Sequence, residues 1–64
     1  MKYWVVAVTG SYSSAMTFYR KFVSEDQELA TLRLGELKAE RSGEYRLYEV
    51  QGETMNTYEF RRLA

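Results

Sequence analysis

Apolar residues are densest at the start of the chain, where β-branched and aromatic types run together. Residues 2–9, KYWVVAVT, predict a β-strand. Both sides of this strand are apolar: one carries Trp4, Val6 and Val8, and the other carries Tyr3, Val5 and Ala7. A strand that faces water on one side normally alternates apolar with polar residues. We therefore expect both of its faces to contact other parts of the protein or a partner.

A second strand is predicted after a turn. Residues 10–14, GSYSS, are typical of a turn, and residues 15–23 return to aromatic and β-favouring types. Met16, Phe18 and Phe22 fall on one side of this strand, with Arg20 interrupting the row. The short connection predicts that it pairs antiparallel with the first strand.

A helix is predicted from Ser24 onward. Residues 24–27, SEDQ, match a capping box with Ser24 as N-cap, and Gly43 suits the C′ position. Gly35 weakens this prediction, because a glycine inside a helix costs about 1 kcal/mol relative to alanine. A strand over residues 31–38 is the competing interpretation. The expected apolar face of the helix consists of Leu29, Ala30, Leu32, Leu34 and Leu37.

Two more strands are predicted at the end of the chain. Residues 44–50 alternate as a third strand, residues 51–53 form a tight connection, and residues 54–63 form a fourth strand. The fold class is therefore α+β, a single domain over residues 1–64 in the order ββαββ, with one helix on one face of a four-stranded antiparallel sheet. The strand order stays open, although the first strand, as the most apolar, is expected to be central.

The face of the sheet opposite the helix is the expected site of function. Tyrosine suits such a surface because it combines a large apolar body with a polar tip, and a contiguous exposed apolar patch usually marks an interaction site. The competing interpretation is that the tyrosines only fill half-buried sheet positions. The residues expected to contact a partner are Tyr3, Val5, Tyr19, Arg46 and Tyr48.

The composition argues against catalysis. The chain has no cysteine and no histidine, which removes thiolate zinc sites, thiol nucleophiles and the commonest general base. We expect no enzyme activity, no catalytic residues, no cofactor and no metal site. A chain of this size buries only about 60% of its unfolded surface, so a homodimer is expected to supply additional burial.

Charge and hydropathy restrict the partner and the location. The formal net charge is zero, which argues against non-specific binding to nucleic acid. The longest apolar run, residues 3–8, is too short to span a membrane, so we expect a cytoplasmic protein that binds an unidentified protein partner. Two alternatives stay open: a structural subunit of a larger assembly, and a single-stranded nucleic-acid binder whose phosphate contacts come from Arg20, Lys21, Arg46, Arg61 and Arg62.

The sequence resembles the very small ββαββ proteins common in bacteriophage genomes. The resemblance covers most of residues 2–50: the start KYWVVAVTG, the aromatic and basic strand TFYRKF, the helix opening SEDQ and the strand GEYRLYEV. It implies a protein that binds and inhibits a host enzyme or defence factor, in the host cytoplasm if the chain is phage-encoded. The resemblance carries no shared site residue to this chain.

Overall fold

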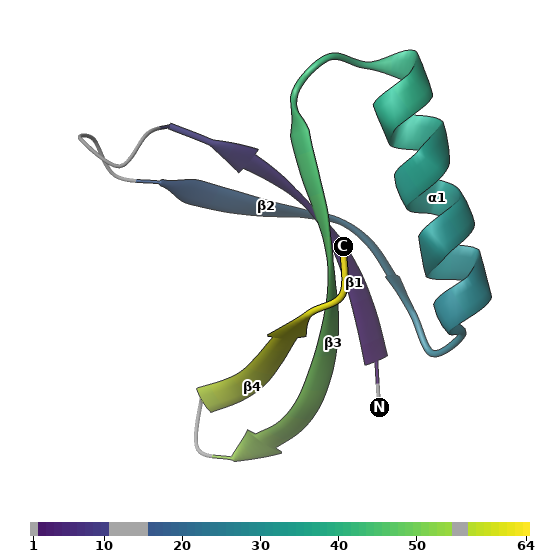
Figure 1. Cartoon of the computed structure of the whole chain (residues 1–64). Helices are drawn as coiled ribbons and strands as arrows, with labels where there is room; N and C mark the ends of the chain where they lie inside the picture. The colour runs from purple at the N-terminus through teal and green to yellow at the C-terminus, as the bar shows by residue number, and fades with distance from the viewer. Residues whose placement is uncertain (1, 11–15, 55–56) are drawn as a thin grey trace.

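Four antiparallel strands form one sheet, and a single helix packs against one face of it (Figure 1). The computed structural model describes residues 2–10, 16–54 and 57–64. The elements follow in the order β1 (Lys2–Thr9), β2 (Thr17–Ser24), α1 (Gln27–Glu40), β3 (Glu44–Thr54) and β4 (Thr57–Arg62). The predicted α+β fold and its ββαββ order are confirmed. The predicted turn at residues 10–14 lies, apart from Gly10, outside the described residues.

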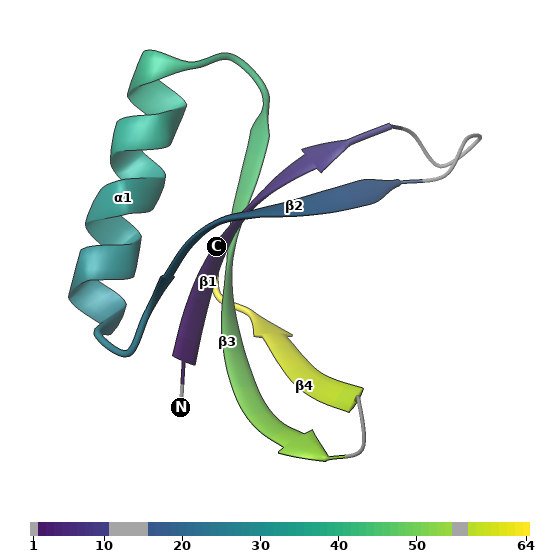
Figure 2. The same ribbon diagram turned by 180° about the vertical axis from the view of Figure 1, so that it is seen from behind.

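The strands lie in the order β2-β1-β3-β4, so β1 is an inner strand as expected. β1 pairs with β2 on one side and with β3 on the other. The hairpins β1–β2 and β3–β4 spread apart on the side away from the helix, as both views show (Figures 1 and 2). The helix therefore covers only part of the sheet.

The core lies between α1 and the odd-numbered residues of β1. Val5 is 0% exposed and belongs to one cluster with residues of the helix and of β3. The side chains packed around this cluster include Phe22 and Leu63, and the chain end is held there by hydrogen bonds between Leu47 and residues 63–64. The other buried members of the cluster are Ala30, Leu34, Leu37, Tyr45 and Leu47.

The helix begins two residues later than predicted. Asp26, not Ser24, is the N-cap, and its Oδ1 accepts a hydrogen bond of 2.9 Å from the backbone N–H of Glu28. Ser24 ends β2, and its hydroxyl accepts from the N–H of Asp26. Both oxygens satisfy backbone donors that a helix start leaves unpaired. At the other end Arg41 is the C-cap, so C′ is Ser42, and Gly43, predicted at C′, lies one residue further along the chain.

Two of the predicted core leucines are exposed. Leu29 and Leu32 are 52% and 64% exposed, whereas Ala30, Leu34 and Leu37 are buried. The helix contacts a narrow part of a twisted sheet, and a stripe of residues at spacings of three and four is enough to cover it. The apolar face predicted from the sequence is therefore too broad, because it included Leu29 and Leu32, which face solvent.

Two irregularities in the strands explain the remaining differences from the predictions. In β2, Val5 pairs with Phe22 and Val6 with Arg20, so Lys21 is the extra residue of a bulge. Phe18 and Phe22 consequently lie on opposite faces, which corrects the expectation of one shared face.

The second irregularity is a shift in the pairing register of β3 with β4, which occurs at Gly52. Gly52 has a φ of +66°, which glycine adopts readily. The predicted connection at residues 51–53 is therefore a bulge, and β3 continues to Thr54. β4 begins at Thr57, later than the predicted residue 54.

The stability of single-site variants tests this division of the leucines. Leu34→Ala removes a buried side chain and should lower the free energy of unfolding by about 2–5 kcal/mol. Leu29→Ala should change it by less than about 0.5 kcal/mol, because the side chain is already in water. Urea denaturation followed by circular dichroism measures both, and equal losses for the two variants would contradict the observed packing.

Candidate functional site

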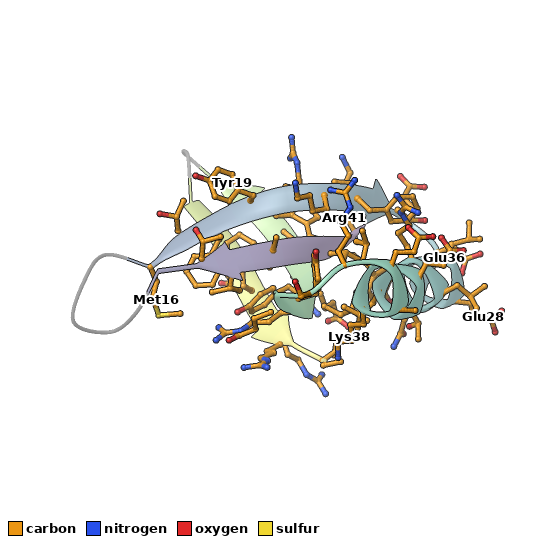
Figure 3. The ribbon with its side chains drawn as sticks, turned by 90° about the horizontal axis from the view of Figure 1, so that it is seen from above. Met16, Tyr19, Glu28, Glu36, Lys38 and Arg41 are labelled. Atoms are coloured by element: carbon orange, nitrogen blue, oxygen red, sulfur yellow. The ribbon has the colours of Figure 1, made fainter. Side chains whose placement is uncertain are left out.

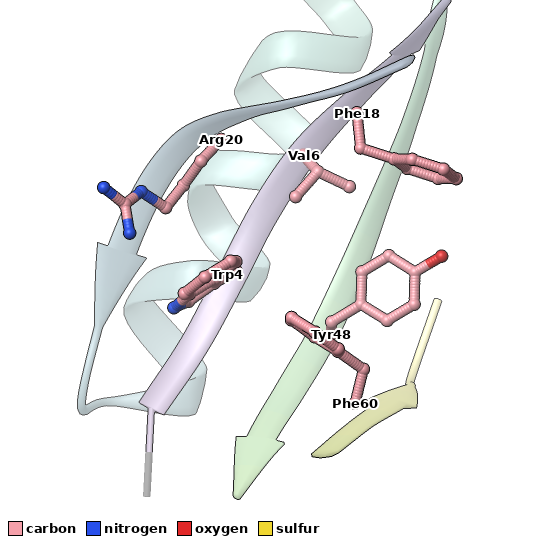
Figure 4. Close-up of a pocket in the computed structure, with 6 residues that line it drawn as sticks. All are labelled: Trp4, Val6, Phe18, Arg20, Tyr48 and Phe60. Atoms are coloured by element: carbon pink, nitrogen blue, oxygen red, sulfur yellow. The ribbon is translucent and has the colours of Figure 1, made fainter. Parts of the chain in front are cut away.

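The face of the sheet opposite α1 carries an aromatic hollow of about 430 Å³. All four strands contribute to it: Trp4 and Val6 come from β1, and the other lining residues come from the neighbouring strands (Figure 4). We call this surface the open face. The side chains that line the hollow from β2, β3 and β4 are Phe18, Arg20, Tyr48 and Phe60.

The open face has a buried floor beneath exposed rings. Val6, Val8 and Val50 lie on this face by register and are buried although no helix covers them. Phe18 and Phe60, in contrast, are 48% and 50% exposed. The sheet thus has a second apolar layer, whose outer surface faces solvent in the single chain.

The aromatic rings hold one another in defined orientations. The rings of Trp4 and Phe60 have centroids 5.3 Å apart at an angle of 68°, and those of Tyr48 and Phe60 are 6.0 Å apart at 79°. Both are edge-to-face arrangements, in which the positive ring edge meets the negative ring face. These contacts join β1, β3 and β4 across the hollow and fix its shape.

Two arginines lie over aromatic rings of this face. The guanidinium of Arg20 is 4.8 Å from the ring centroid of Trp4, and that of Arg46 is 5.6 Å from that of Phe18. Both distances are within the range of a cation–π interaction. Arg20 has no carboxylate partner among the residues that the structure describes, so its charge is available to a ligand.

Arg46 is held more firmly than Arg20. Its Nη1 donates a hydrogen bond of 3.2 Å to the hydroxyl of Tyr48, and its Nε donates one of 2.5 Å to Oε2 of Glu44. These two bonds, the one to Tyr48 first, raise the pKa of the Arg46 guanidinium above its usual value. The residue is therefore a fixed positive charge at the edge of the hollow.

The zero net charge conceals a separation of charge between the two sides of the molecule. Residues paired directly across strands share a face. Among the side chains that the structure describes, this register gives the open face one carboxylate, Glu44, and four cations, which are Lys2, Arg20, Arg46 and Arg62. Acidic residues gather instead around the start of the helix, at Glu25, Asp26 and Glu28.

The structure corrects the placement of three of the five predicted contact residues. Arg46 and Tyr48 lie together on the open face as expected. Val5 lies under the helix and Tyr3 packs against the same core. Tyr19 pairs with Ala7 and shares its face, although it is exposed.

Val5 and Tyr3 lie on the helix side of the sheet because Val5 pairs with Leu47 of β3. Leu47 belongs to the core cluster under the helix, so the odd-numbered sides of β1 and β3 face the core together. Both sides of β1 are apolar, so alternation in the sequence does not show that Trp4 and Val6 lie on the open face. Trp4, Phe18 and Phe60 were missed for this reason.

Two further searches of the described residues concern metal-ligating side chains and membrane-spanning helices. Within residues 2–10, 16–54 and 57–64, no three His, Cys, Asp or Glu side chains gather closely enough to hold a metal ion. The helix of the described chain is not long and apolar enough to cross a membrane.

Comparison with protein-family models, with curated proteins and with solved structures gives no match to this chain. The open face is therefore the feature of this chain that indicates a function.

The fluorescence of Trp4, the only tryptophan, reports on the hollow. Phe60→Ala removes the ring that lies against the indole, so water should reach Trp4 and its emission maximum should move to longer wavelength. Leu29→Ala, on the far side of the sheet, should leave the emission unchanged. A Phe60→Ala spectrum identical to that of the wild type, in a folded protein, would contradict the observed hollow.

Proposed function

We propose that the chain is a non-enzymatic protein-binding module that docks a partner protein on its open face. The observation that carries this proposal is an uncovered aromatic hollow bordered by arginines. Tryptophan, tyrosine and arginine are the residues most enriched among those that dominate binding energy in protein interfaces. An inhibitor of a host enzyme or defence factor, as the resemblance to small phage proteins implies, would use this face to cover a surface of its target.

The rigidity of the open face supports binding. The ring contacts of Phe60 and the two hydrogen bonds of Arg46 hold these side chains in place before a partner arrives. Ordering flexible side chains on binding costs about 0.5–1.5 kcal/mol each. A preformed surface avoids much of this cost.

The β2 edge of the sheet is a poorer candidate than the open face. β2 forms one edge, and an edge strand with free backbone groups can pair with a strand of another protein. The bulge at Lys21 interrupts the regular spacing of those groups and places a lysine there. Bulges and lysines on edge strands are devices that prevent such pairing.

Single-stranded nucleic acid is the second candidate, because the described side chains of the open face include four cations and one carboxylate. Aromatic side chains on an open sheet can stack on bases. Arginine side chains already lie over the rings of Trp4 and Phe18, however. A base would have to displace them, so the protein partner is the better proposal.

A capture experiment with matched variants tests the proposal. Tagged protein is incubated with lysate of a plausible host, and the retained proteins are identified by mass spectrometry. A specific partner should be retained by the wild type and by Lys38→Glu, a charge reversal on the helix. Phe18→Ser and Arg20→Glu, at exposed positions of the open face, should reduce its retention at least about tenfold.

The same variants distinguish the second candidate. Titration of the wild type with single-stranded oligonucleotides at low salt, followed by Trp4 fluorescence, should show no saturable binding in the micromolar range. Binding that is lost in Arg20→Glu and falls steeply with added salt would favour nucleic acid. Retention of the same proteins by all four forms would contradict docking on the open face.

A further inference from the structure

The outer surface of α1 has features that the single chain does not explain. Glu28, Leu32, Gly35 and Ala39 follow at spacings of four, three and four, so they form one stripe along the helix. This stripe lies opposite the buried Ala30, Leu34 and Leu37, and all four of its residues are exposed. A view along the helix shows Glu28 on the side turned away from the sheet (Figure 3).

Gly35 is the least expected member of this stripe. A glycine inside a helix costs about 1 kcal/mol relative to alanine. Among the described residues, a Cβ added at Gly35 meets nothing within 4 Å, so packing against them does not require glycine there. Glycine on an exposed helix surface allows another segment to approach the backbone closely.

The charge of this surface is complementary to that of the open face. Glu28 lies near Glu25 and Asp26 at the start of the helix, and the first basic residue along α1, Arg33, is bound to Glu36 at 2.9 Å. The open face carries Arg20 without a carboxylate partner among the described residues. The apolar parts match as well, since Leu32 is a protruding aliphatic side chain and the hollow is larger than one leucine side chain.

We propose that the open face binds the outer surface of α1 of a second copy of this chain, in a head-to-tail arrangement. Leu32 of one copy enters the aromatic hollow of the next, and Glu28 lies against Arg20. The contact places the outer surface of a helix, with Leu32 as its one large aliphatic side chain, against an apolar hollow. The proposal rests on the proposed function, because it names a partner for the same open face.

The open face and α1 lie on opposite sides of the molecule, because the helix packs on one side of the sheet and the two hairpins spread apart on the other (Figure 1). One copy can therefore contact a second copy through its open face and a third through its helix.

A symmetric dimer through two open faces is less favourable. It would bring the four described cations of one copy against the same four of the other, and like charges across an interface are repulsive. Head-to-tail contact pairs unlike surfaces instead. Such contact leaves an unused open face at one end and an unused helix at the other, so association continues beyond two copies. The homodimer expected from the sequence would then be the first product of this continuing head-to-tail association.

Sedimentation velocity over a range from low micromolar to several hundred micromolar tests the proposal. The wild type should sediment faster as concentration rises, without a plateau at two copies. Arg20→Glu and Glu28→Arg should each lower the association constant at least about tenfold. Glu40→Arg, the same charge change at the other end of the helix, should sediment like the wild type.

Mixing the two charge variants gives the most specific result. In an equimolar mixture the two variants can alternate, and every contact between them again joins one carboxylate to one guanidinium. At one contact both charges are reversed, and at the next both are the original Arg20 and Glu28. Association should return to within about threefold of the wild type.

The glycine of the helix gives an independent test. Gly35→Ala should raise the melting temperature of the single chain, because alanine favours the helix and the new methyl group meets no neighbour. The same methyl group should weaken association, because it holds the second copy away from the helix backbone. A variant that is more stable and associates as strongly as the wild type would contradict close approach at Gly35.

Several outcomes would overturn the proposal. These are a wild type that remains monomeric at every concentration, a plateau at two copies that Glu28→Arg does not affect, and a mixture that fails to associate. A monomeric wild type that still captures a lysate protein through Phe18 and Arg20 would overturn only this inference. A wild type that captures no lysate protein through Phe18 and Arg20 would count against the proposed function itself.

Discussion

The pairing of Val5 on β1 with Leu47 on β3 is the contact on which the rest of the structure depends. Both residues are almost fully buried, and they place the odd-numbered side of β1 against Ala30, Leu34 and Leu37. Because successive side chains of a strand point to opposite faces, a shift of one residue would exchange the two sides completely. The same pairing therefore determines that Trp4 and Val6 lie on the open face.

The open face exists because the helix packs against one side of the sheet, whereas both sides of the sheet are apolar. The helix is 14 residues long and contacts β1, β2 and β3. The second apolar layer is partly covered by its own aromatic rings and arginines, which bury Val6 and Val50 while the rings stay half-exposed. A surface of this kind is stable in water because its rim is charged, yet it retains apolar area that a partner can bury.

The sequence was sufficient to predict the elements, their order and the two-sided character of β1, because these depend on local patterns. It was insufficient to predict which side the helix covers, since both sides of β1 are apolar and alternation alone cannot rank them. The bulge at Lys21 places Phe18 and Phe22 on opposite faces, and no local signal in TFYRKF marks it. Gly52 offered such a signal, but a glycine suits a bulge and a turn equally well. Of the predicted contact residues, Arg46 and Tyr48 lie on the open face, and Leu47 between them belongs to the core cluster under the helix.

The most direct test of the open face uses the absence of cysteine from the chain. Phe18→Cys and Phe22→Cys are prepared separately, and their reaction with a thiol reagent is timed at a concentration too low for association. The thiol of Phe18→Cys should react nearly as fast as in the unfolded chain, whereas that of Phe22→Cys, packed against the core, should react far more slowly. Equal rates for the two variants, or a faster reaction of Phe22→Cys, would contradict the placement of Phe18 on the open face and of Phe22 at the core.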